Sequence, residues 1–177
     1  MASSSRTSII RGDAQVKVLV VVPCGRSKVW DREPHRGPVA AAEAYTGTPF
    51  RLNRQYAECF GDAWVVLSAK YGFIAPDFMI PEPYEVSFKH PATRPIPFVR
   101  FREQVREQQL GRYPVVVGLG GKEYRAAIGA AFADLPTRLV FPFAGLPLGK
   151  SLQAAKQAIT SGDPGIHLYE AGDGRSG

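Results

Sequence analysis

The stretch Val16-Lys17-Val18-Leu19-Val20-Val21-Val22 decides the fold class. It is almost continuously apolar and β-branched, which is typical of a strand buried on both faces of a parallel sheet. Pro23 and Cys24 follow the run and end the strand. The same apolar character recurs in three further short runs, residues 63–69, 113–119 and 138–143. The sequence therefore predicts about four buried strands.

Helical patterns alternate with these strands. They cover residues 39–45, 48–60, 98–110, 122–132 and 148–159. In the second of them we expect Thr48 as the N-cap and Pro49 at the first helical position. Strands that alternate with helices imply right-handed crossovers and a parallel sheet. We expect an α/β three-layer sandwich with a mostly parallel central sheet of about four strands and helices on both faces.

Length and composition predict one domain. The chain has 177 residues, of which 45% are apolar and 21% charged, as in an ordinary globular domain. We place this domain at residues 16–162, between a flexible N-terminal segment (1–15) and a flexible C-terminal tail (163–177). The sequence shows neither a secretory signal nor an apolar run of membrane-spanning length, so we expect a cytoplasmic protein with no membrane partner. It leaves the oligomeric state open.

The net charge and the spacing of cysteines and histidines limit the classes of ligand that we expect. A net charge of +6 favours polyanions such as nucleic acid, and Arg100, Arg102 and Arg106 form one basic group, although a solvated basic face has the same composition. Cys24 and Cys59 form no paired pattern, and the three histidines are scattered. We therefore expect no metal site and no cofactor.

The segment from Lys70 to Pro97 is too long for an ordinary connection and contains six prolines. It also carries many bulky apolar residues, which a disordered segment lacks. We expect it to fold over the sheet edge as a lid, with Tyr84 facing a ligand and its removal costing little stability. The alternative is core packing alone, with Tyr84 pointing away.

Polar residues follow each predicted strand. In open α/β sheets, ligands bind at the carboxyl ends of the strands, where these residues meet. We expect the side chains of Ser27, Lys28, Ser68 and Lys70 to line one pocket there. Two lysines at one edge repel each other unless an anion lies between them, which predicts a phosphate or carboxylate ligand. Either lysine could instead pair with an acidic residue, of which the candidates are Asp31, Glu43, Glu82 and Glu85.

Other residues at this edge have two interpretations each. Cys24 is either a small buried hydrophobe or a nucleophile beside basic residues. Gly120 and Gly121 either turn the chain or let backbone amides meet an anion at a helix N-terminus. Aromatic rings could stack on a base, the candidates being Tyr45, Phe50, Tyr71, Tyr84 and Tyr124, with Phe50 also expected in the core.

Several of these motifs resemble a known family. The residues that carry the resemblance are Cys24-x-x-Ser27-Lys28, Tyr45-Thr46-Gly47-Thr48-Pro49-Phe50, Leu67-Ser68-Ala69-Lys70-Tyr71-Gly72, Ile80-Pro81, Pro83-Tyr84, and Phe143-Ala144-Gly145-Leu146 before Gly149-Lys150. They resemble the YaaA-like, or peroxide-stress-like, domains of bacteria and phages. The first motif is more remotely similar to the uracil-DNA-glycosylase-like domain of archaeosine synthases. The resemblance implies a connection with nucleic acids or nucleobases, but the water-activating loop of classical uracil-DNA glycosylases and a helix-hairpin-helix motif are absent from the sequence.

We therefore expect a protein that binds a nucleotide, nucleobase or nucleic acid, with three possible roles. It could be a hydrolase or transferase acting on N-glycosidic bonds, with Cys24, Lys28, Lys70 and Glu123 as catalytic candidates. Glu82 and Glu85 are further candidate carboxylates, and Ser27, Tyr45, Ser68, Tyr71, Tyr84, Gly120, Gly121 and Tyr124 would bind the substrate. It could instead be a non-catalytic DNA-binding protein that uses the arginine group, or a sensor of small nucleotides in a stress response.

Overall fold

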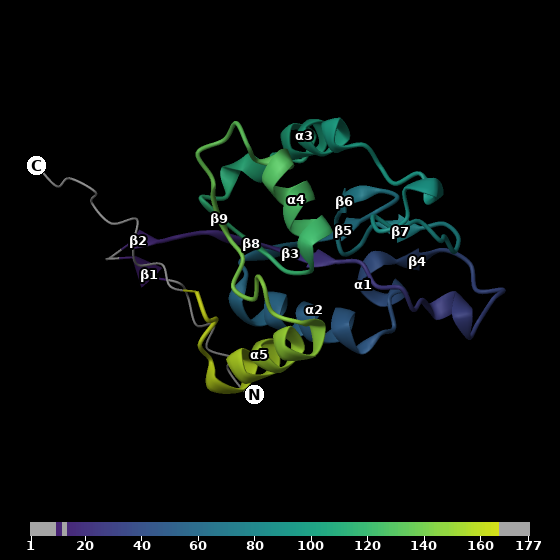
Figure 1. Ribbon diagram of the computed structural model, residues 1–177, viewed down its shortest axis with the longest axis horizontal. Coiled ribbons are helices and arrows are strands. Elements are labelled where there is room, and N and C mark those ends of the chain that lie inside the picture. The colour runs from purple at the N-terminus through teal and green to yellow at the C-terminus, as the bar shows by residue number, and fades with distance from the viewer. Residues whose placement is uncertain (1–9, 12–13, 167–177) are drawn as a thin grey trace, which may run out of the picture.

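The computed structural model, which describes residues 10, 11 and 14–166, places the apolar run at the centre of a five-stranded sheet (Figure 1). The strands lie in the order β6 (Gly72–Ile74), β5 (Ala63–Ser68), β3 (Val18–Pro23), β8 (Val115–Gly118) and β9 (Arg138–Val140). The strands β3, β5, β8 and β9 are parallel, and β6 is antiparallel to β5. Every residue of β3 is buried, because neighbouring strands pair with both of its edges and helices cover both of its faces.

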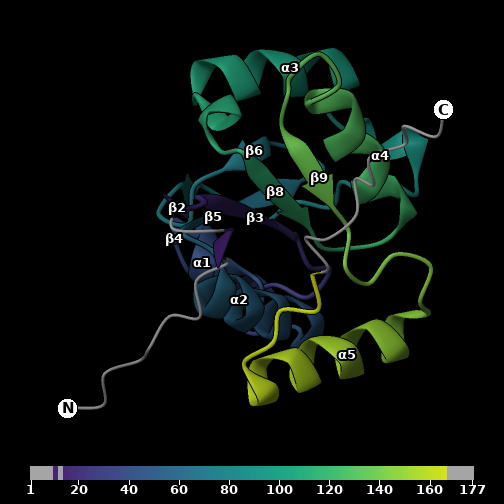
Figure 2. The same cartoon turned by 90° about the vertical axis from the view of Figure 1, so that its left-hand side faces the viewer.

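The side chains of β3 alternate between two apolar clusters. Val18, Val20 and Val22 belong to a cluster that includes residues of α2 (Thr48–Phe60) and α5 (Leu148–Ser161). Leu19 and Val21 belong to a second cluster with residues of α3 (Phe98–Glu107) and α4 (Lys122–Ala131). Figure 2 shows these two pairs of helices on opposite sides of the sheet. A strand with apolar residues at successive positions fits this arrangement, because both of its faces lie against helices.

The predicted mixed α/β class and the mostly parallel sheet are confirmed, but the sheet has five strands where about four were expected. The additional strand, β6, lies within the segment that was predicted to be irregular. It begins at Gly72, whose φ of +73° is in the region that glycine tolerates best. A side chain at Gly72 would also collide with Gln104 of α3, so the turn between β5 and β6 requires glycine.

Smaller elements complete the chain. Residues 39–45, which were predicted to be a helix, form β4 (Val39–Ala40) and α1 (Ala41–Ala44). The strand β4 pairs with β7 (Met79–Ile80). Helix α2 begins at Thr48 with Gly47 as its N-cap, one residue earlier than predicted. Single turns of 3-10 helix occur at Val29–Asp31, Pro91–Thr93 and Leu110–Arg112.

The predicted flexible ends lie largely outside the described residues, which exclude 1–9, 12–13 and 167–177. Within the first of them, β1 (Ile10–Arg11) pairs with β2 (Ala14–Gln15). Among the described residues, none of the helices combines the length and the apolar character that crossing a membrane requires.

Candidate functional site

The segment after β3 lies against the ends of two other elements. The backbone amide of Cys24 donates to the carbonyl of Leu67 at 3.0 Å, which extends the β3–β5 pairing beyond β3. The amide of Thr46 donates to the carbonyl of Ser27, also at 3.0 Å. Lys28 forms an isolated β-bridge with Tyr45. These contacts bring the predicted site residues of three separate segments to one edge of the sheet.

Residues 75–97, here called the lid segment, cross this edge between β6 and α3. Tyr84 lies at the inner side of the segment and is buried. Its hydroxyl oxygen is 2.5 Å from that of Tyr45 and 2.8 Å from Oγ of Ser68. The segment therefore folds over the sheet edge, and Tyr84 points inward, not away. Tyr84 belongs to the apolar core, as the core-packing alternative expected, and its contact with a ligand stays a prediction. However, the burial of Tyr84 contradicts the expectation that its removal costs little stability.

The hydroxyl of Ser68 determines which group donates in its hydrogen bond with Tyr84. Its oxygen accepts the backbone amides of Lys70 at 3.2 Å and Tyr71 at 3.1 Å. Both lone pairs are then occupied, so the hydroxyl proton is left to donate to Tyr84. Ser68 thus shapes the turn after β5 and anchors the lid segment at the same time.

Lys28 and Lys70 both approach the ring of Tyr84. The Nζ atom of Lys28 lies 4.6 Å from the ring centroid, and that of Lys70 lies 5.7 Å from it. Lys28 is buried, and its Nζ donates to the carbonyl of Arg26 at 3.1 Å. Burial lowers the pKa of Lys28, an effect that the charges of Cys24, Asp31 and Glu85 partly offset. Among residues 14–166, neither Lys28 nor Lys70 has an ion-pair partner within 4.0 Å.

The predicted pocket of Ser27, Lys28, Ser68 and Lys70 is only partly realised. Lys28, Ser68 and Lys70 meet at Tyr84, whereas Ser27 is exposed and contributes its backbone carbonyl to the edge. The ring of Tyr84 occupies the space between the three side chains. The sequence analysis expected Tyr84 at this edge facing a ligand, but not its direct contacts with these three side chains.

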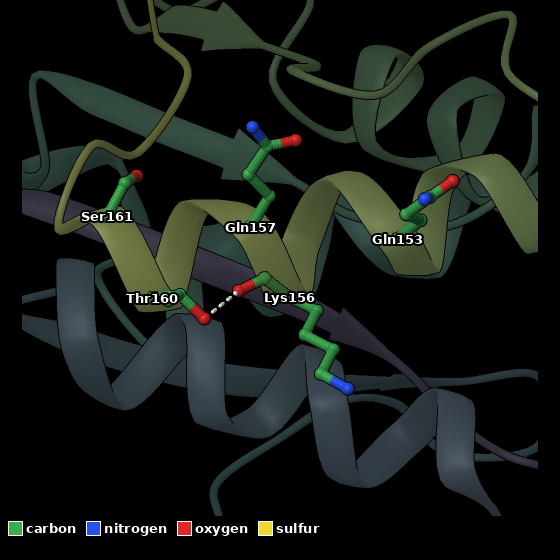
Figure 3. Close-up of a pocket in the computed structure, with 5 residues that line it drawn as sticks. All are labelled: Gln153, Lys156, Gln157, Thr160 and Ser161. Atoms are coloured by element: carbon green, nitrogen blue, oxygen red, sulfur yellow. Dashed lines mark hydrogen bonds between the residues drawn. The ribbon is translucent and has the colours of Figure 1, made fainter.

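Two surface depressions lie away from this edge. One, of about 430 Å³, is formed by residues 33–36 of one loop, and the other, of about 450 Å³, lies on α5. Figure 3 shows the polar side chains that line the second depression, all of them from α5. Each depression is built from a single segment, so neither gathers polar groups from several elements as ligand sites do.

Cys24 and Tyr124 form a second polar contact at the same edge. The Sγ atom of Cys24 lies 3.2 Å from the hydroxyl of Tyr124, a residue in the first turn of α4. The thiol is half-buried, and both cysteines are free. Burial raises the pKa of Tyr124, and the adjacent Cys24 adds to this rise. The same two causes, in the same order, raise the pKa of Tyr45 and Tyr84, so all three phenols remain protonated at neutral pH.

The candidate carboxylates lie at the rim. Glu85 is exposed but close enough to Lys28 to act on its charge, and Glu123 is half-buried and acts on Tyr124 in the same way. Glu82 is exposed on the lid segment. The closest carboxylate contact at Lys28 is made by Asp31, which accepts the backbone amide of Lys28 at 2.9 Å. Glu85 and Glu123 thus flank the site from two different elements.

Gly120 and Gly121 precede α4, as the sequence predicted. Gly120 has a φ of +106°, and a Cβ atom there would lie 3.1 Å from the side chains of both Pro23 and Tyr124. The backbone therefore needs glycine at position 120 for packing alone. Contact of these glycines with an anion remains a prediction.

Gln104 is a positioning residue that sequence reasoning missed. Its side chain accepts the amide of Phe73 at 2.9 Å and donates to the carbonyl of Tyr71 at 2.7 Å. It thereby holds the turn that carries Lys70 and Tyr71. A signal was present, because Gln104 is a polar residue between Phe101 and Val105 on the buried face of α3.

Two arginines of the group on α3 form ion pairs with acidic residues of the protein. Arg100 pairs with Glu103, and Arg102 pairs with Asp134 at 3.1 Å while it donates to the carbonyl of Ala130. Two of the three arginines that were expected to contact nucleic-acid phosphates therefore have partners within the protein. This weakens the prediction that α3 is a nucleic-acid surface.

Comparison with known proteins gives two matches. A protein family described as a family of unknown function (DUF6884) matches residues 19–157. An uncharacterized protein of Bacillus subtilis (strain 168), YfjM, is 34% identical over 145 residues, which is 81% of this chain and 96% of that protein. No solved structure matches. These matches lend no support to the YaaA-like resemblance or to the more remote one.

Proposed function

We propose that this chain, which belongs to the DUF6884 family of unknown function, is a nucleotide- or nucleobase-binding protein. Its site is the edge formed by the carboxyl ends of β3, β5 and β8 beneath the lid segment. One observation carries the proposal: two lysine ammonium groups lie within 6 Å of the ring centroid of Tyr84, and neither has an ion-pair partner within the part of the chain that the structure describes.

The two ammonium groups favour an anionic ligand. Like charges repel more strongly where water is excluded, and Lys28 is buried. Most buried charges in proteins are paired, because an unpaired one loses its hydration without compensation. A phosphate group near Lys28 and Lys70 would supply the missing negative charge. Ring contacts with Tyr84 compensate only in part, since a cation–π contact contributes ~0.5–2 kcal/mol.

A row of aromatic rings leads from this anion position to the surface. The ring of Tyr71 lies 5.4 Å from that of Tyr84 and 5.4 Å from that of Phe78. Tyr71 is half-buried, and Phe78 is exposed. Exposed aromatic faces beside a cationic site suit a nucleobase, whose stacking contributes ~1–3 kcal/mol in single-strand binders.

The first test is thermal unfolding with a panel of nucleobases, nucleosides and nucleotides, with inorganic phosphate as the control for the anion alone. A ligand at about 100 times its Kd stabilises the folded state by ~2.7 kcal/mol, which shifts the Tm of a chain of this size by several degrees. We expect nucleotides to give the largest shift. If no member of the panel shifts the Tm, the proposal is wrong.

A matched pair of variants locates the binding. Lys70→Met removes one ammonium group from the site, and Lys156→Met removes one from the exposed surface of α5 (Figure 3). We expect the ligand-induced shift to be lost in the first variant and kept in the second. Equal shifts in both variants would place the ligand elsewhere.

Cleavage of an N-glycosidic bond is a second candidate, favoured by Glu85 and Glu123 on two sides of the site. In such a hydrolysis the bond from the base to C1′ breaks, water adds its oxygen to C1′, and the base leaves with a proton. Lys28 and Lys70 would hold the phosphate, and Cys24 with Tyr124 would contact the reacting sugar. Chromatography would detect free base after incubation with nucleotides. We expect Glu123→Gln to abolish its release, whereas no release by the wild-type protein would exclude the reaction for those substrates.

A further inference from the structure

Residues 87–94 of the lid segment, here called the basic loop, are closed by one threonine. Oγ1 of Thr93 accepts the amide of Ser87 at 3.0 Å, and its proton lies between the carbonyls of Ser87 at 3.1 Å and His90 at 2.6 Å. The amide of His90 also donates to Ser87, and that of Arg94 donates to Pro91. The loop therefore has a defined shape that is set by its own hydrogen bonds.

The basic loop presents unpaired cations to solvent. Lys89, His90 and Arg94 are exposed, and the sequence contains no acidic residue between Glu85 and Glu103. Among residues 14–166, neither Lys89 nor Arg94 has an ion-pair partner, in contrast to Arg100 and Arg102 of α3. Positive charge is thus concentrated in this loop, and no acidic side chain of the described residues forms an ion pair with Lys89 or Arg94.

Arg94 holds an unfavourable backbone conformation. Its φ of +57° places a non-glycine residue in the left-handed region. Such residues cost free energy of order 1 kcal/mol and persist where the surrounding structure imposes them. Here the amide of Arg94 donates to the carbonyl of Pro91, and the amide of Ile96 ties the next segment to the carbonyl of Ala69, just after β5. The arginine side chain is exposed to solvent.

Both ends of the basic loop adjoin the candidate site. At its start, the ring of Phe88 lies 5.3 Å from the ring of Tyr124, whose hydroxyl contacts Cys24. Beyond its end, the amide of Ile96 donates to the carbonyl of Ala69, which precedes Lys70. Exposed apolar side chains follow at Phe98 and Val99. The exposed cations of the basic loop are thus followed by two exposed apolar side chains at the start of α3.

We infer that the basic loop binds the phosphate backbone of a single-stranded nucleic acid, so that the nucleotide in the site is part of a longer strand. The inference rests on the proposed function and extends it to the substrate class. Clustered cations with an exposed aromatic side chain nearby in the chain, here Phe98, are features of single-strand binding surfaces. An acidic protein segment would match the charge but not the adjacent nucleotide site, so the nucleic acid is the partner that both features favour.

The test compares two ligands in three proteins. Fluorescence anisotropy measures the affinity for a labelled single-stranded oligonucleotide at several salt concentrations, and thermal unfolding measures the shift with a mononucleotide. The proteins are the wild type, the double variant Lys89→Gln/Arg94→Gln, and the control Lys150→Gln/Lys156→Gln, which removes the same charge from exposed positions of α5.

We expect the loop variant to bind the oligonucleotide at least tenfold more weakly at low salt, with the control unchanged. Its salt dependence should also fall, since each lost phosphate contact lowers the log–log slope by ~0.7 for a single strand. The mononucleotide shift should be the same in all three proteins, because the substituted residues lie outside the site.

Each outcome separates the two proposals. Equal oligonucleotide affinity in the loop variant and the wild type would overturn the inference and leave the proposed function intact. Weaker oligonucleotide binding in the loop variant, without any mononucleotide shift in the wild type, would support the basic loop and contradict the proposed function. Displacement of the oligonucleotide by polyglutamate of equal charge would identify the loop as a general anion surface and overturn its assignment to nucleic acid.

Discussion

Two consecutive parts of the lid segment are held in opposite ways. Residues 78–86 are tied to the body of the protein, through β7, through the carbonyl of Phe78 that accepts the amide of Ala41, and through the buried hydroxyl of Tyr84. Residues 87–94 are tied mainly to themselves, through Thr93. The first part carries acidic side chains and contacts the site through Tyr84, whereas the second carries exposed cations.

The difference shows that one irregular segment can combine two parts: residues 78–86 anchor it to the body of the protein, and residues 87–94 form an exposed surface. Removing an anchor should cost stability, and removing a surface residue should leave stability unchanged. Four substitutions test this division, in the order of their expected effects.

Tyr84→Ala should lower the free energy of unfolding by ~3–5 kcal/mol, as other buried aromatic truncations do. The substitution empties the space among Lys28, Ser68 and Tyr45 and leaves their polar groups without a partner. Urea unfolding measures the change. Tyr84→Phe is the control that keeps the ring, and we expect it to lose only ~1–3 kcal/mol. A loss below ~0.5 kcal/mol for Tyr84→Ala would show that residues 78–86 are not an anchor.

Lys28→Met should raise the stability at neutral pH by ~1–4 kcal/mol, because it replaces a buried charge by an apolar chain of similar length. It should also abolish nucleotide binding. Lysine ordinarily titrates near 10.5, and burial lowers the pKa of Lys28 in the folded protein. The unfolded chain then binds more protons between the two pKa values, so wild-type stability gains with rising pH in that window.

The pH dependence of Lys28→Met is measured as a difference from the wild type, because the buried tyrosines act in the other direction. Their raised pKa values remove stability above pH ~10, in both proteins. We expect the stability gain of the variant to shrink as the pH rises toward 10.5. A gain that is independent of pH would show that the charge of Lys28 costs nothing.

Thr93→Val should open the basic loop with little change in the body. It removes the hydroxyl that closes the loop, which corresponds to ~0.5–1.5 kcal/mol for a hydrogen bond. Hydrogen exchange should become faster at the amides of Ser87 and His90, whose partners are lost or loosened. The amides of β3 serve as the internal control. Faster exchange in β3 as well would mean that the loop is coupled to the core.

Lys89→Gln should change the free energy of unfolding by less than ~0.5 kcal/mol, since the side chain is exposed and has no ion-pair partner among residues 14–166. Its effect should be confined to oligonucleotide affinity. A measurable loss of stability would indicate that Lys89 stabilises the fold and would contradict the assignment of residues 87–94 as a surface only.

The fold was largely readable from the sequence where the local pattern was strong. The run from Val16 to Val22 predicted the central strand, and the predicted positions of α2 to α5 agreed with the structure within a few residues. In such long segments the spacing of apolar residues shows which face is buried, and this spacing indicates the type of element. The strand β6 was not readable. Its three residues gain their structure from pairing with β5 and from Gln104, a residue thirty positions further along the chain.

For the site, the sequence by itself determined which groups meet: parallel strands end at one edge, so Lys28, Ser68 and Lys70 had to come together there. Only the tertiary structure decided that Tyr84 contacts all three of them. It also decided that Arg100 and Arg102 form ion pairs, whereas Lys89 and Arg94 have none among the residues that the structure describes. The physical reason is that strand direction follows from local pattern and chain connectivity. The position of a side chain within a long loop, and the partner of a surface charge, depend on which distant groups the finished fold brings within a few ångströms.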